Sequence, residues 1–583
     1  MSVSQLFRRK SLQEIYHHHE NQHEGQKLKR VLTVRDLTMF GIAAVIGAGV
    51  FSTIGSAAFT GGPAVILLFI FTAIACGFCA LCYAEFASSV PIAGTAYTYS
   101  YLAFGEFIAW VIGWDLLMEY AISDIVLTIS WSQYFVGLLK NYGITVPVHF
   151  TMDYFSAYHA NEYVQALLTK GQSLTEIFNS IGDPLIRKGY EAWSSAPRLG
   201  GLAIIFDLPT ILITTFVTAI IIRGIEGSKS FSTVMVVLKL AVLFFVVAVG
   251  AFYINPDNWV PFAPNGASGV MKGVSAVFFA YIGFDVISTT AEECKNPQKD
   301  LPKAMIYTLL ICTLIYIILG LVVTGVVHYT QLQVGDPLAY IFGSEGANLP
   351  WFSSVIAVSA IVAIAGVLLV YQLGQTRIWM VMSRDGLLPS MFGKIHPHYK
   401  TPWISSIIAG LFVAIPSLFL NLREVTDLSS IGTLFAMLLV SAGVLVLDPY
   451  NRDTNKKFRM PYINGKYTFP ALLLITALSF AFCQQQGYLT VFEFADFTET
   501  SRLFHKIPLF IFILELLALG VWSYLKSLSL IPLIAVSLSS YLITELGTVT
   551  WVRFGVWLIV GGLVYFCYGF KHSVLNKKAD LNN

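Results

Sequence analysis

Thr38-Met-Phe-Gly-Ile-Ala-Ala-Val-Ile-Gly-Ala-Gly-Val-Phe-Ser52 is the stretch of sequence that decides the fold. It lies inside an apolar run long enough to cross a bilayer, yet it carries glycines at positions 41, 47 and 49. Each glycine lowers the helix propensity by about 1 kcal/mol relative to alanine. The stretch therefore predicts a membrane helix that is interrupted near its middle.

A second stretch, Phe278-Phe-Ala-Tyr-Ile-Gly-Phe-Asp285, combines small residues with a charge at mid-depth in a later apolar run. Unwound backbone is tolerated in a membrane only where it is buried in protein or lines a cavity. The two stretches fall in the first and sixth apolar runs, which occupy equivalent places if runs 1–5 and 6–10 are two repeats. Such paired interruptions indicate a transporter with an inverted repeat and a binding site near the bilayer midplane.

The composition of the whole chain is that of a membrane protein. Of its 583 residues, 56% are hydrophobic and only 12% are charged, whereas a soluble domain has about 25% charged residues. This excludes a soluble enzyme, a disordered chain and a nucleic-acid binder. Cys76, Cys79 and Cys82 have the spacing of metal ligands, but they lie in an apolar run without a cationic neighbour, which favours a packing role.

The chain is predicted to be an all-α integral membrane protein, because it contains many runs of about 20 apolar residues. Fourteen such runs are found, and twelve or thirteen spans are the alternative because the last runs are short or closely spaced. The runs cover 36–58, 63–88, 104–138, 202–222, 231–254, 269–291, 303–327, 350–383, 404–421, 427–448, 467–487, 507–525, 528–546 and 551–570. The predicted organisation is a tail (1–35), a first five-helix repeat (36–254), a second repeat (269–448), additional C-terminal helices (467–570) and a tail (571–583).

The distribution of basic residues predicts the orientation in the membrane. Most Lys and Arg residues fall in the N-terminal tail and in alternate connecting segments, so the positive-inside rule places both termini in the cytoplasm. The segment 140–201 is the one sizeable polar insert, and it is expected on the extracellular or periplasmic side. Its weak amphipathic pattern predicts short helices over 160–169 and 174–181, and its function is not predicted.

The two interruptions have a chemistry that suits a small zwitterion. Free amide N–H groups near Ala48 and Gly49, at the start of the outer half-helix, favour a carboxylate. Unpaired carbonyls near Val45 and in 279–282 accept hydrogen bonds from an ammonium. An α-amino acid carries both groups at this separation. The alternative reading of Gly-Ala-Gly is close packing of helices, and a dinucleotide site is excluded because no soluble βαβ unit surrounds it.

Several motifs together make the chain similar to a known family. It resembles the amino acid–polyamine–organocation (APC) superfamily and, within it, a bacterial member of the cationic amino acid transporter family. The long insert and the fourteen apparent spans depart from a typical bacterial member and are closer to the eukaryotic branch. The stretches that carry the resemblance are 41–51, Leu81-Cys-Tyr-Ala-Glu-Phe-Ala87, Pro91-Ile-Ala-Gly-Thr-Ala-Tyr97, Gly113-Trp-Asp-Leu-Leu-Met-Glu-Tyr120, 279–285, 292–302, Gly374-Gln-Thr-Arg377, 382–389 and Trp551-Val-Arg-Phe554.

The resemblance implies a LeuT-type fold of five plus five helices in inverted repeat, with discontinuous helices 1 and 6. It also implies an L-amino acid substrate and alternating access. The implied substrate carboxylate binds the amides of Ala48 and Gly49, and Phe279 closes over the substrate from outside as an aromatic gate. Ala48 stands where relatives often have a hydroxyl residue. The implied substrate-binding residues are Val45, Ile46, Ala48, Gly49, Phe279, Ala280 and Ile282.

Lys239 lies nine residues into an apolar run, too deep to reach the membrane surface easily. An intramembrane lysine is a functional hypothesis by default, because it costs about 2.5–3.5 kcal/mol on insertion scales. Burial disfavours the charged form, so such a lysine can bind and release a proton. In several family members a lysine on this helix replaces a sodium ion. We therefore predict that Lys239 couples transport to a proton by bonding carbonyls of spans 1 and 8. A permanent ion pair with a carboxylate is the alternative.

Four of the acidic residues in the apolar runs lie in spans 3 and 6 and are candidates for a functional role. Asp115 and Glu119 are four residues apart and share one helix face. Glu119 is either a substrate-binding carboxylate that attracts a cationic side chain or a hydrogen-bonded structural acid. Asp124 lies closer to the outer end and is expected to be solvated, and Asp285 is expected to cap a half-helix.

The function predicted from the sequence is proton-coupled uptake of L-amino acids across the bacterial cytoplasmic membrane, without a cofactor other than the proton. A sodium-independent exchanger or facilitated carrier for cationic amino acids is the alternative within transport. A membrane sensor of amino acids is the alternative of another class. A membrane enzyme or a channel is disfavoured, since neither a metal-binding motif nor a continuous polar pore is evident. The partners are the substrate and the lipid bilayer, without nucleic acid, and the sequence does not indicate an oligomeric state.

Overall fold

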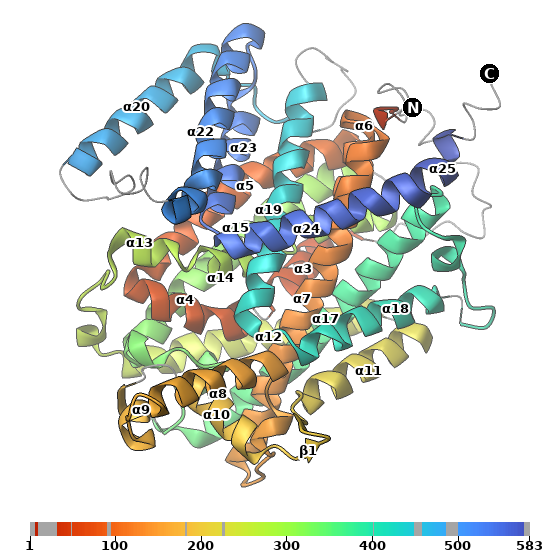
Figure 1. The fold of residues 1–583 in the computed structure, drawn as a ribbon. Coiled ribbons are helices and arrows are strands. Elements are labelled where there is room, and N and C mark those ends of the chain that lie inside the picture. The colour runs from red at the N-terminus through yellow and green to blue at the C-terminus, as the bar shows by residue number, and fades with distance from the viewer. Residues whose placement is uncertain are drawn as a thin grey trace.

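The computed structural model describes residues 6–9, 32–47, 49–89, 95–180, 184–223, 228–344, 346–399, 401–447, 458–485 and 500–576. This part of the chain is mainly α-helical and contains one short antiparallel hairpin, in which Arg198 pairs with Ala203. The helices form a single large bundle (Figure 1). The prediction of an all-α membrane protein is confirmed at this level.

The bounds of the elements follow the order of the chain. Up to residue 259 they are α3 (Val34–Val45), η2 (Gly49–Thr53), α4 (Ile54–Gly61), η3 (Gly62–Ala64), α5 (Val65–Ser89), α6 (Thr95–Ala103), α7 (Glu106–Asn141), η4 (Val148–Phe150), α8 (Tyr154–Leu168), α9 (Leu174–Ser180), α10 (Pro184–Ser195), β1 (Arg198–Leu199), β2 (Leu202–Ala203), α11 (Leu208–Arg223), α12 (Ser228–Gly250), η5 (Ala251–Tyr253) and η6 (Pro256–Trp259).

The remaining elements include two further broken regions and the C-terminal helices. They are α13 (Gly266–Met271), α14 (Val274–Phe279), η7 (Asp285–Glu293), α15 (Pro297–Val326), η8 (Tyr329–Gln331), α16 (Pro337–Tyr340), α17 (Pro350–Arg384), η9 (Ser390–Gly393), α18 (Trp403–Ala414), η10 (Pro416–Leu418), α19 (Leu422–Leu447), α20 (Gly465–Gln485), α22 (Thr500–Lys526), α23 (Leu530–Thr544), α24 (Thr548–Val564), η11 (Tyr565–Gly569) and α25 (Phe570–His572).

Nine helical segments within the described ranges are long and apolar enough to cross a membrane, and three shorter apolar helices accompany them. Two of the apolar runs seen in the sequence make shorter α-helices than expected. The run 202–222 becomes helical only at Leu208, because the hairpin occupies residues 198–203. The run 404–421 changes from α-helix to a 3₁₀ turn at Pro416, where the proline lacks the N–H that would continue the α-helix.

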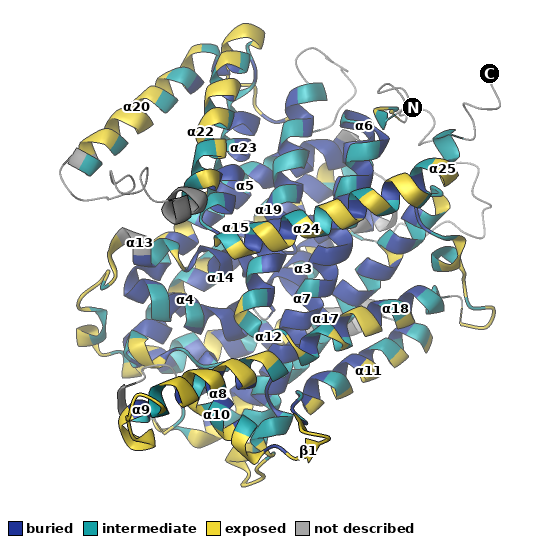
Figure 2. Cartoon of the chain, viewed as in Figure 1, coloured by how far each residue is buried: buried dark blue, intermediate teal, exposed yellow. Residues whose placement is uncertain are grey.

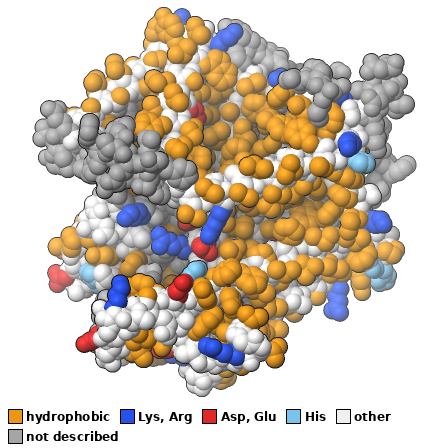
Figure 3. Space-filling model, viewed as in Figure 1, with side chains coloured by type: hydrophobic (Ala, Val, Ile, Leu, Met, Phe, Trp, Pro, Cys, Tyr) orange, Lys and Arg blue, Asp and Glu red, His pale blue; other side chains and the backbone are white. Residues whose placement is uncertain are grey.

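The bundle has a buried centre and an apolar outer face. Helices α3, α7, α14 and α19 are mostly buried, whereas α20 and α22 stand at one side and are more exposed (Figure 2). Most of the exposed side chains on these outer helices are apolar, including Leu474, Leu478, Leu514 and Leu517. Hydrophobic side chains cover most of the visible face (Figure 3). A surface of this kind matches lipid tails rather than water.

The polar insert folds as a cap of short helices, α8 to α10, at the end of the molecule opposite the two termini (Figure 1). It has a small core of its own that includes Met152, Ala157 and Ala192. Asp153 begins α8 by accepting a hydrogen bond from the Ser156 amide at 2.8 Å. The predicted helices over 160–169 and 174–181 correspond to parts of α8 and α9, whereas α10 was not predicted.

The first and last described segments of the chain meet on one side of the bundle. Arg8 donates hydrogen bonds to the Leu575 carbonyl at 3.2 Å and to the Asn576 side chain at 3.0 Å. The Arg8 carbonyl accepts from the Glu106 amide at 2.9 Å, at the start of α7. Residues 6–9 and 575–576 therefore lie on the same side of the bundle.

Glu106 is the centre of this contact between the chain ends. It is 2% exposed, and its carboxylate accepts hydrogen bonds from the hydroxyls of Ser573 at 2.6 Å, Tyr565 at 3.0 Å and Tyr101 at 3.2 Å. One acidic side chain thus holds the C-terminal segment against the start of α7.

Replacement of Glu106 by Ala is expected to lower the stability of the fold by about 1–3 kcal/mol, since three buried hydroxyls lose their acceptor. Thermal unfolding of the purified protein in detergent measures the change. Glu191→Ala is the control, because its ion pair with Arg187 is exposed and such pairs contribute about 0–1 kcal/mol. Equal melting temperatures for the two variants would contradict the role of Glu106 in holding the C-terminal segment against α7.

Candidate substrate-binding site

The first membrane helix is interrupted at the glycine-rich stretch. Helix α3 ends at Val45, and the next helical turn is the π-helix η2, which begins at Gly49. Ile46 has left the helical conformation, and the Gly47 carbonyl accepts from the amides of Val50 and Phe51 at 3.2 Å. Ala48 lies outside the described residues. The interruption falls where the glycine spacing predicted it.

The second interruption lies between α14 and η7. Helix α14 ends at Phe279, a short turn follows, and Gly283 adopts a φ of +114°, which favours glycine. The 3₁₀-helix η7 then begins at Asp285, whose carboxyl is hydrogen-bonded to backbone amides of its own turn, including that of Val286. Phe284 is the N-cap of η7 and Asp285 its first residue, so the predicted capping role of Asp285 stays a prediction.

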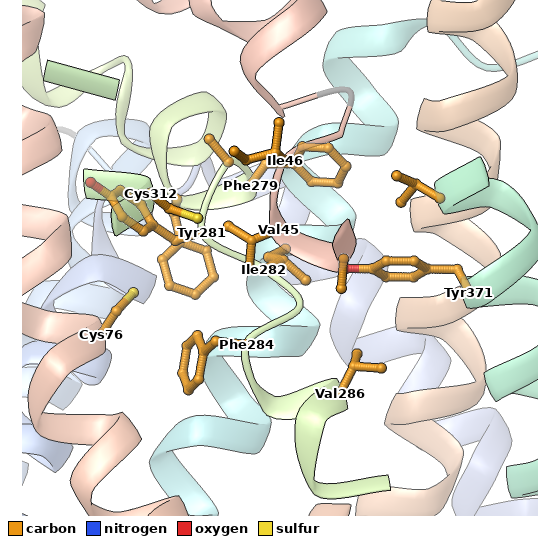
Figure 4. Close-up of a cluster of buried hydrophobic side chains, with 14 of the residues drawn as sticks. Val45, Ile46, Cys76, Phe279, Tyr281, Ile282, Phe284, Val286, Cys312 and Tyr371 are labelled. Carbon is orange, nitrogen blue, oxygen red and sulfur yellow. The ribbon is translucent and has the colours of Figure 1, made fainter. Parts of the chain in front are cut away.

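The two interruptions touch each other in the buried centre of the bundle. A Cβ atom built on Gly49 would lie 2.3 Å from the Ala280 Cα and 2.8 Å from the Ala280 Cβ. Val45, Ile46, Phe279 and Ile282 converge at the same place (Figure 4), and none of these four side chains is more than 7% exposed. The structure therefore brings the described residues of the predicted substrate-binding set together from two distant parts of the sequence.

A tyrosine that the sequence analysis did not single out joins the two breaks. The hydroxyl of Tyr316, in α15, lies 2.7 Å from the Ala280 carbonyl and 3.1 Å from the Val45 carbonyl. These are two of the carbonyls predicted to accept from a substrate ammonium. Each carbonyl oxygen has two lone pairs, so both can still accept from a second donor. The only feature of the sequence that could have pointed to Tyr316 is a polar hydroxyl inside an apolar run.

Replacement of Tyr316 by Phe is expected to raise the KM for uptake roughly 2- to 10-fold, because the one hydroxyl proton that the two carbonyls share, a hydrogen bond of about 0.5–1.5 kcal/mol, would no longer hold the breaks together. Initial rates of uptake at graded substrate concentrations measure this effect. Tyr462→Phe is the control, since its hydroxyl also bonds a carbonyl, that of Ser527, but on the exposed surface. An unchanged KM for Tyr316→Phe would contradict the bridging role.

Lys239, in α12, is 3% exposed and binds the first interruption directly. Its ammonium donates to the carbonyls of Ile46 at 2.8 Å and Ala43 at 2.9 Å. These are carbonyls at the end of α3 that the interruption leaves without helical partners. The predicted bond to span 1 is present, whereas no hydrogen bond joins this ammonium to α17, the eighth span, all of which is described. In the described part of the chain it also has no ion pair with a carboxylate.

A cluster of acids lies between α7, α19 and η7. Glu119 is 2% exposed, is hydrogen-bonded to the Thr433 side chain and interacts electrostatically with Asp285. A Cβ built on Gly432 of α19 would lie 3.0 Å from a carboxyl oxygen of Asp115 and 3.6 Å from the Cβ of Glu119. The two acids therefore share one face of α7, as predicted. The predicted role of Glu119 in substrate binding stays a prediction.

The expectation that Asp124 is solvated is wrong. Its side chain is 0% exposed, and neither carboxyl oxygen has a hydrogen-bond partner among the described residues. Residue 124 lies at the midpoint of α7, which runs from Glu106 to Asn141. The apolar run 104–138 already placed it within a few residues of mid-span, so burial was the better prediction.

Residues of α7 and α17 close the sides of the site. Val367 and Leu127 lie 3.4 Å and 3.6 Å from a Cβ built on Gly47. Tyr371 reaches from α17 to the second interruption, where its hydroxyl would be 2.9 Å from a Cβ on Gly283 (Figure 4). The cysteines at 76, 79 and 82 are buried, and no metal-binding group is found in the part of the chain that the structure describes.

Comparison with known proteins identifies the family. The sequence pattern of the amino acid permease family matches residues 32–502, and that of its C-terminal region matches residues 528–573. The chain belongs to the amino acid permease family. Membership of a transporter family agrees with the prediction that the protein is not an enzyme, and it supports the predicted place in the APC superfamily.

Individual relatives of the permease extend over nearly the whole chain. A methylthioribose transporter of Bacillus subtilis is 34% identical, over 99% of this chain and 100% of its own. A branched-chain amino acid permease of the same organism is 34% identical, over 98% and 99%. A vacuolar cationic amino acid transporter of Arabidopsis thaliana is 29% identical, over 98% and 97%. The permease is thus a multi-span membrane protein, and its Bacillus relatives are consistent with a bacterial plasma membrane.

Proposed function

We propose that the permease takes up an L-amino acid by alternating access, coupled to a proton. The observation that carries this proposal is the contact between the two helix breaks at Gly49 and Ala280, in the buried centre of the bundle. A substrate bound between them would meet free backbone dipoles of both signs, and an α-amino acid carries the two matching charges. The names of two of the relatives, which refer to branched-chain and cationic amino acids, support this substrate class.

The architecture we propose is the five-plus-five inverted repeat, with 36–254 and 269–448 as the repeats and 467–570 as additional helices. It rests on the equivalent places of the two breaks, in the first and sixth spans. Cytoplasmic location of both termini is supported by the contact of Arg8 with Leu575 and Asn576, which keeps these residues on one side. The position of the polar insert at the other end of the molecule agrees with an outward-facing cap (Figure 1).

Proton coupling through Lys239 is proposed from its position. Its buried ammonium bonds two carbonyls of the first break. The first break is also the part of the protein that we propose contacts the substrate. Loss of the proton from Lys239 would release those carbonyls and change the local structure of the break. Exchange or facilitated diffusion, which need no net proton movement, are the competing modes.

A second candidate substrate is methylthioribose. A full-length relative at 34% identity carries that name. Methylthioribose lacks the carboxylate and the ammonium of an amino acid. It would therefore not use the backbone amides and carbonyls of the breaks as binding partners for two charges.

Two experiments test the proposal: a screen for ligand binding, and uptake into liposomes with and without a pH gradient. Thermal unfolding of the purified permease is recorded with each of the twenty amino acids and with methylthioribose, because a ligand that binds the folded state raises the melting temperature. Uptake of the stabilising compound into liposomes is then measured with and without an imposed pH gradient. We expect stabilisation by a set of amino acids and uphill uptake only with the gradient, independent of sodium.

Other outcomes would identify the alternatives. Stabilisation by methylthioribose alone would replace the amino acid as substrate. Exchange without uphill uptake would remove the proton from the mechanism. Binding without any transport would favour a sensor.

A further inference from the structure

A buried tyrosine on α7 holds the outer part of the first broken helix. The hydroxyl of Tyr134 donates to the Phe51 carbonyl in η2 at 2.5 Å, and the two rings meet edge to face with centroids 6.2 Å apart. Both side chains are 0% exposed. Phe51 lies only two residues beyond Gly49, where the breaks touch. The bond therefore joins α7 to the backbone directly next to the candidate site.

The same part of α7 also packs against the loop between α15 and α17. On the next turn of α7, a Cβ on Gly137 would lie 2.8 Å from a carboxyl oxygen of Asp336. On the other side of the loop, a Cβ on Gly55 of α4 would lie 2.5 Å from the Leu332 carbonyl. Tyr134 thus joins η2 to α7, and α7 and α4 both pack against the α15–α17 loop beside this bond.

These elements lie on the side of the site that faces the cap. Helix α7 continues from Tyr134 to Asn141 and then enters the polar insert. Helix α4 follows η2 away from α3 and packs on the α15–α17 loop. A substrate that arrives from the cap side has to pass η2 and α7, the two elements that Tyr134 joins.

We infer that Tyr134 is the latch of the outer gate, and that its bond to the Phe51 carbonyl keeps the site closed towards the cap side. The inference rests on the proposed function, because a gate requires a transported substrate. In the closed state the Phe51 carbonyl is buried, and the hydroxyl is a second donor to it besides the helix backbone. In an open state water would bond both groups. The hydrogen bond therefore favours the closed state specifically.

Removal of the hydroxyl shifts this balance without removing the ring. A single hydrogen bond of about 0.5–1.5 kcal/mol corresponds to a change of roughly 2- to 10-fold in the ratio of open to closed states. Tyr134→Phe is therefore expected to increase access to η2 from the cap side by this factor. It is also expected to lower the rate of transport, because the site has to close in each cycle.

The test uses a thiol in η2 as the reporter. Ser52 is 0% exposed and its hydroxyl has no hydrogen-bond partner among the described residues, so Ser52→Cys is a small change. Cys567, an exposed thiol, is replaced by Ser, and the other described native thiols are buried. Labelling with a membrane-impermeant thiol reagent added outside intact cells is followed with time. Tyr565→Phe, which loses a buried hydroxyl bond near the chain ends, is the matched control.

We expect Tyr134→Phe to be labelled about 2- to 10-fold faster than the Ser52→Cys background, and Tyr565→Phe to be labelled at the background rate. Labelling of Tyr134→Phe at the background rate would overturn the latch. Equal acceleration in both variants would also overturn it, since the effect would then reflect general loosening. The assay needs no substrate, so a wild-type protein without any uptake would refute the proposed function separately.

Discussion

Gly49→Ala is expected to reduce uptake by about 100-fold, close to the background of empty liposomes. The added methyl group would lie 2.3 Å from the Ala280 Cα, which is backbone and does not move aside as a flexible side chain does. The two breaks would have to separate, and overpacking of this kind typically costs 1–3 kcal/mol and sometimes more. Uptake of radiolabelled substrate into liposomes measures the loss.

Gly47→Ala is the matched control, because it lies in the same break and restores the same helix propensity of about 1 kcal/mol. A Cβ at this position would lie 3.4 Å from the ends of the Val367 side chain, an ordinary contact. We expect its uptake to remain within about threefold of wild type. Melting temperatures of both variants show whether either has failed to fold. Similar activities of the two variants would mean that the contact with Ala280 is not important for transport.

The sequence predicted the two interruptions because their signals are local. Glycines two residues apart, and an aspartate within an apolar run, oppose a continuous helix whatever surrounds them. Lys239 was found for the same reason, since a charge in an apolar run is visible without any knowledge of its partners. The bond of Lys239 to the first break was predicted, but its partners Ala43 and Ile46 were not named, and the predicted bond to span 8, which is described throughout, is absent.

Two of the omissions concern tertiary contacts. Tyr316 and Tyr134 each donate to carbonyls of the first broken helix, but a tyrosine in an apolar run is ordinary and its partner cannot be read from the sequence. The partners of these two tyrosines depend on how distant segments pack, and they were therefore not predictable from the sequence. Asp124 and α10 are different, because their signals were local: the run 104–138 already placed residue 124 near mid-span, and α10 is amphipathic in its own sequence.

Lys239→Met is expected to abolish uphill, pH-dependent uptake, with a decrease of about 100-fold. Methionine fills a similar volume but cannot donate, so the carbonyls of Ala43 and Ile46 would lose their donor. Each buried group left unpaired costs about 1–3 kcal/mol. Uptake into liposomes under imposed pH gradients measures the effect. Uphill uptake at the wild-type level would refute any coupling role of this residue.

Lys239→Arg separates a coupling role from a purely structural one. A guanidinium stays protonated and can still donate to both carbonyls, so a structural role would be retained. If proton release by Lys239 is the coupling step, the arginine variant should exchange labelled for unlabelled substrate but should not accumulate it. Counterflow, which needs no net proton movement, and gradient-driven uptake in the same liposomes measure the two activities. Retained accumulation with arginine would mean that Lys239 holds the break as a permanent cation, and that the proton binds elsewhere.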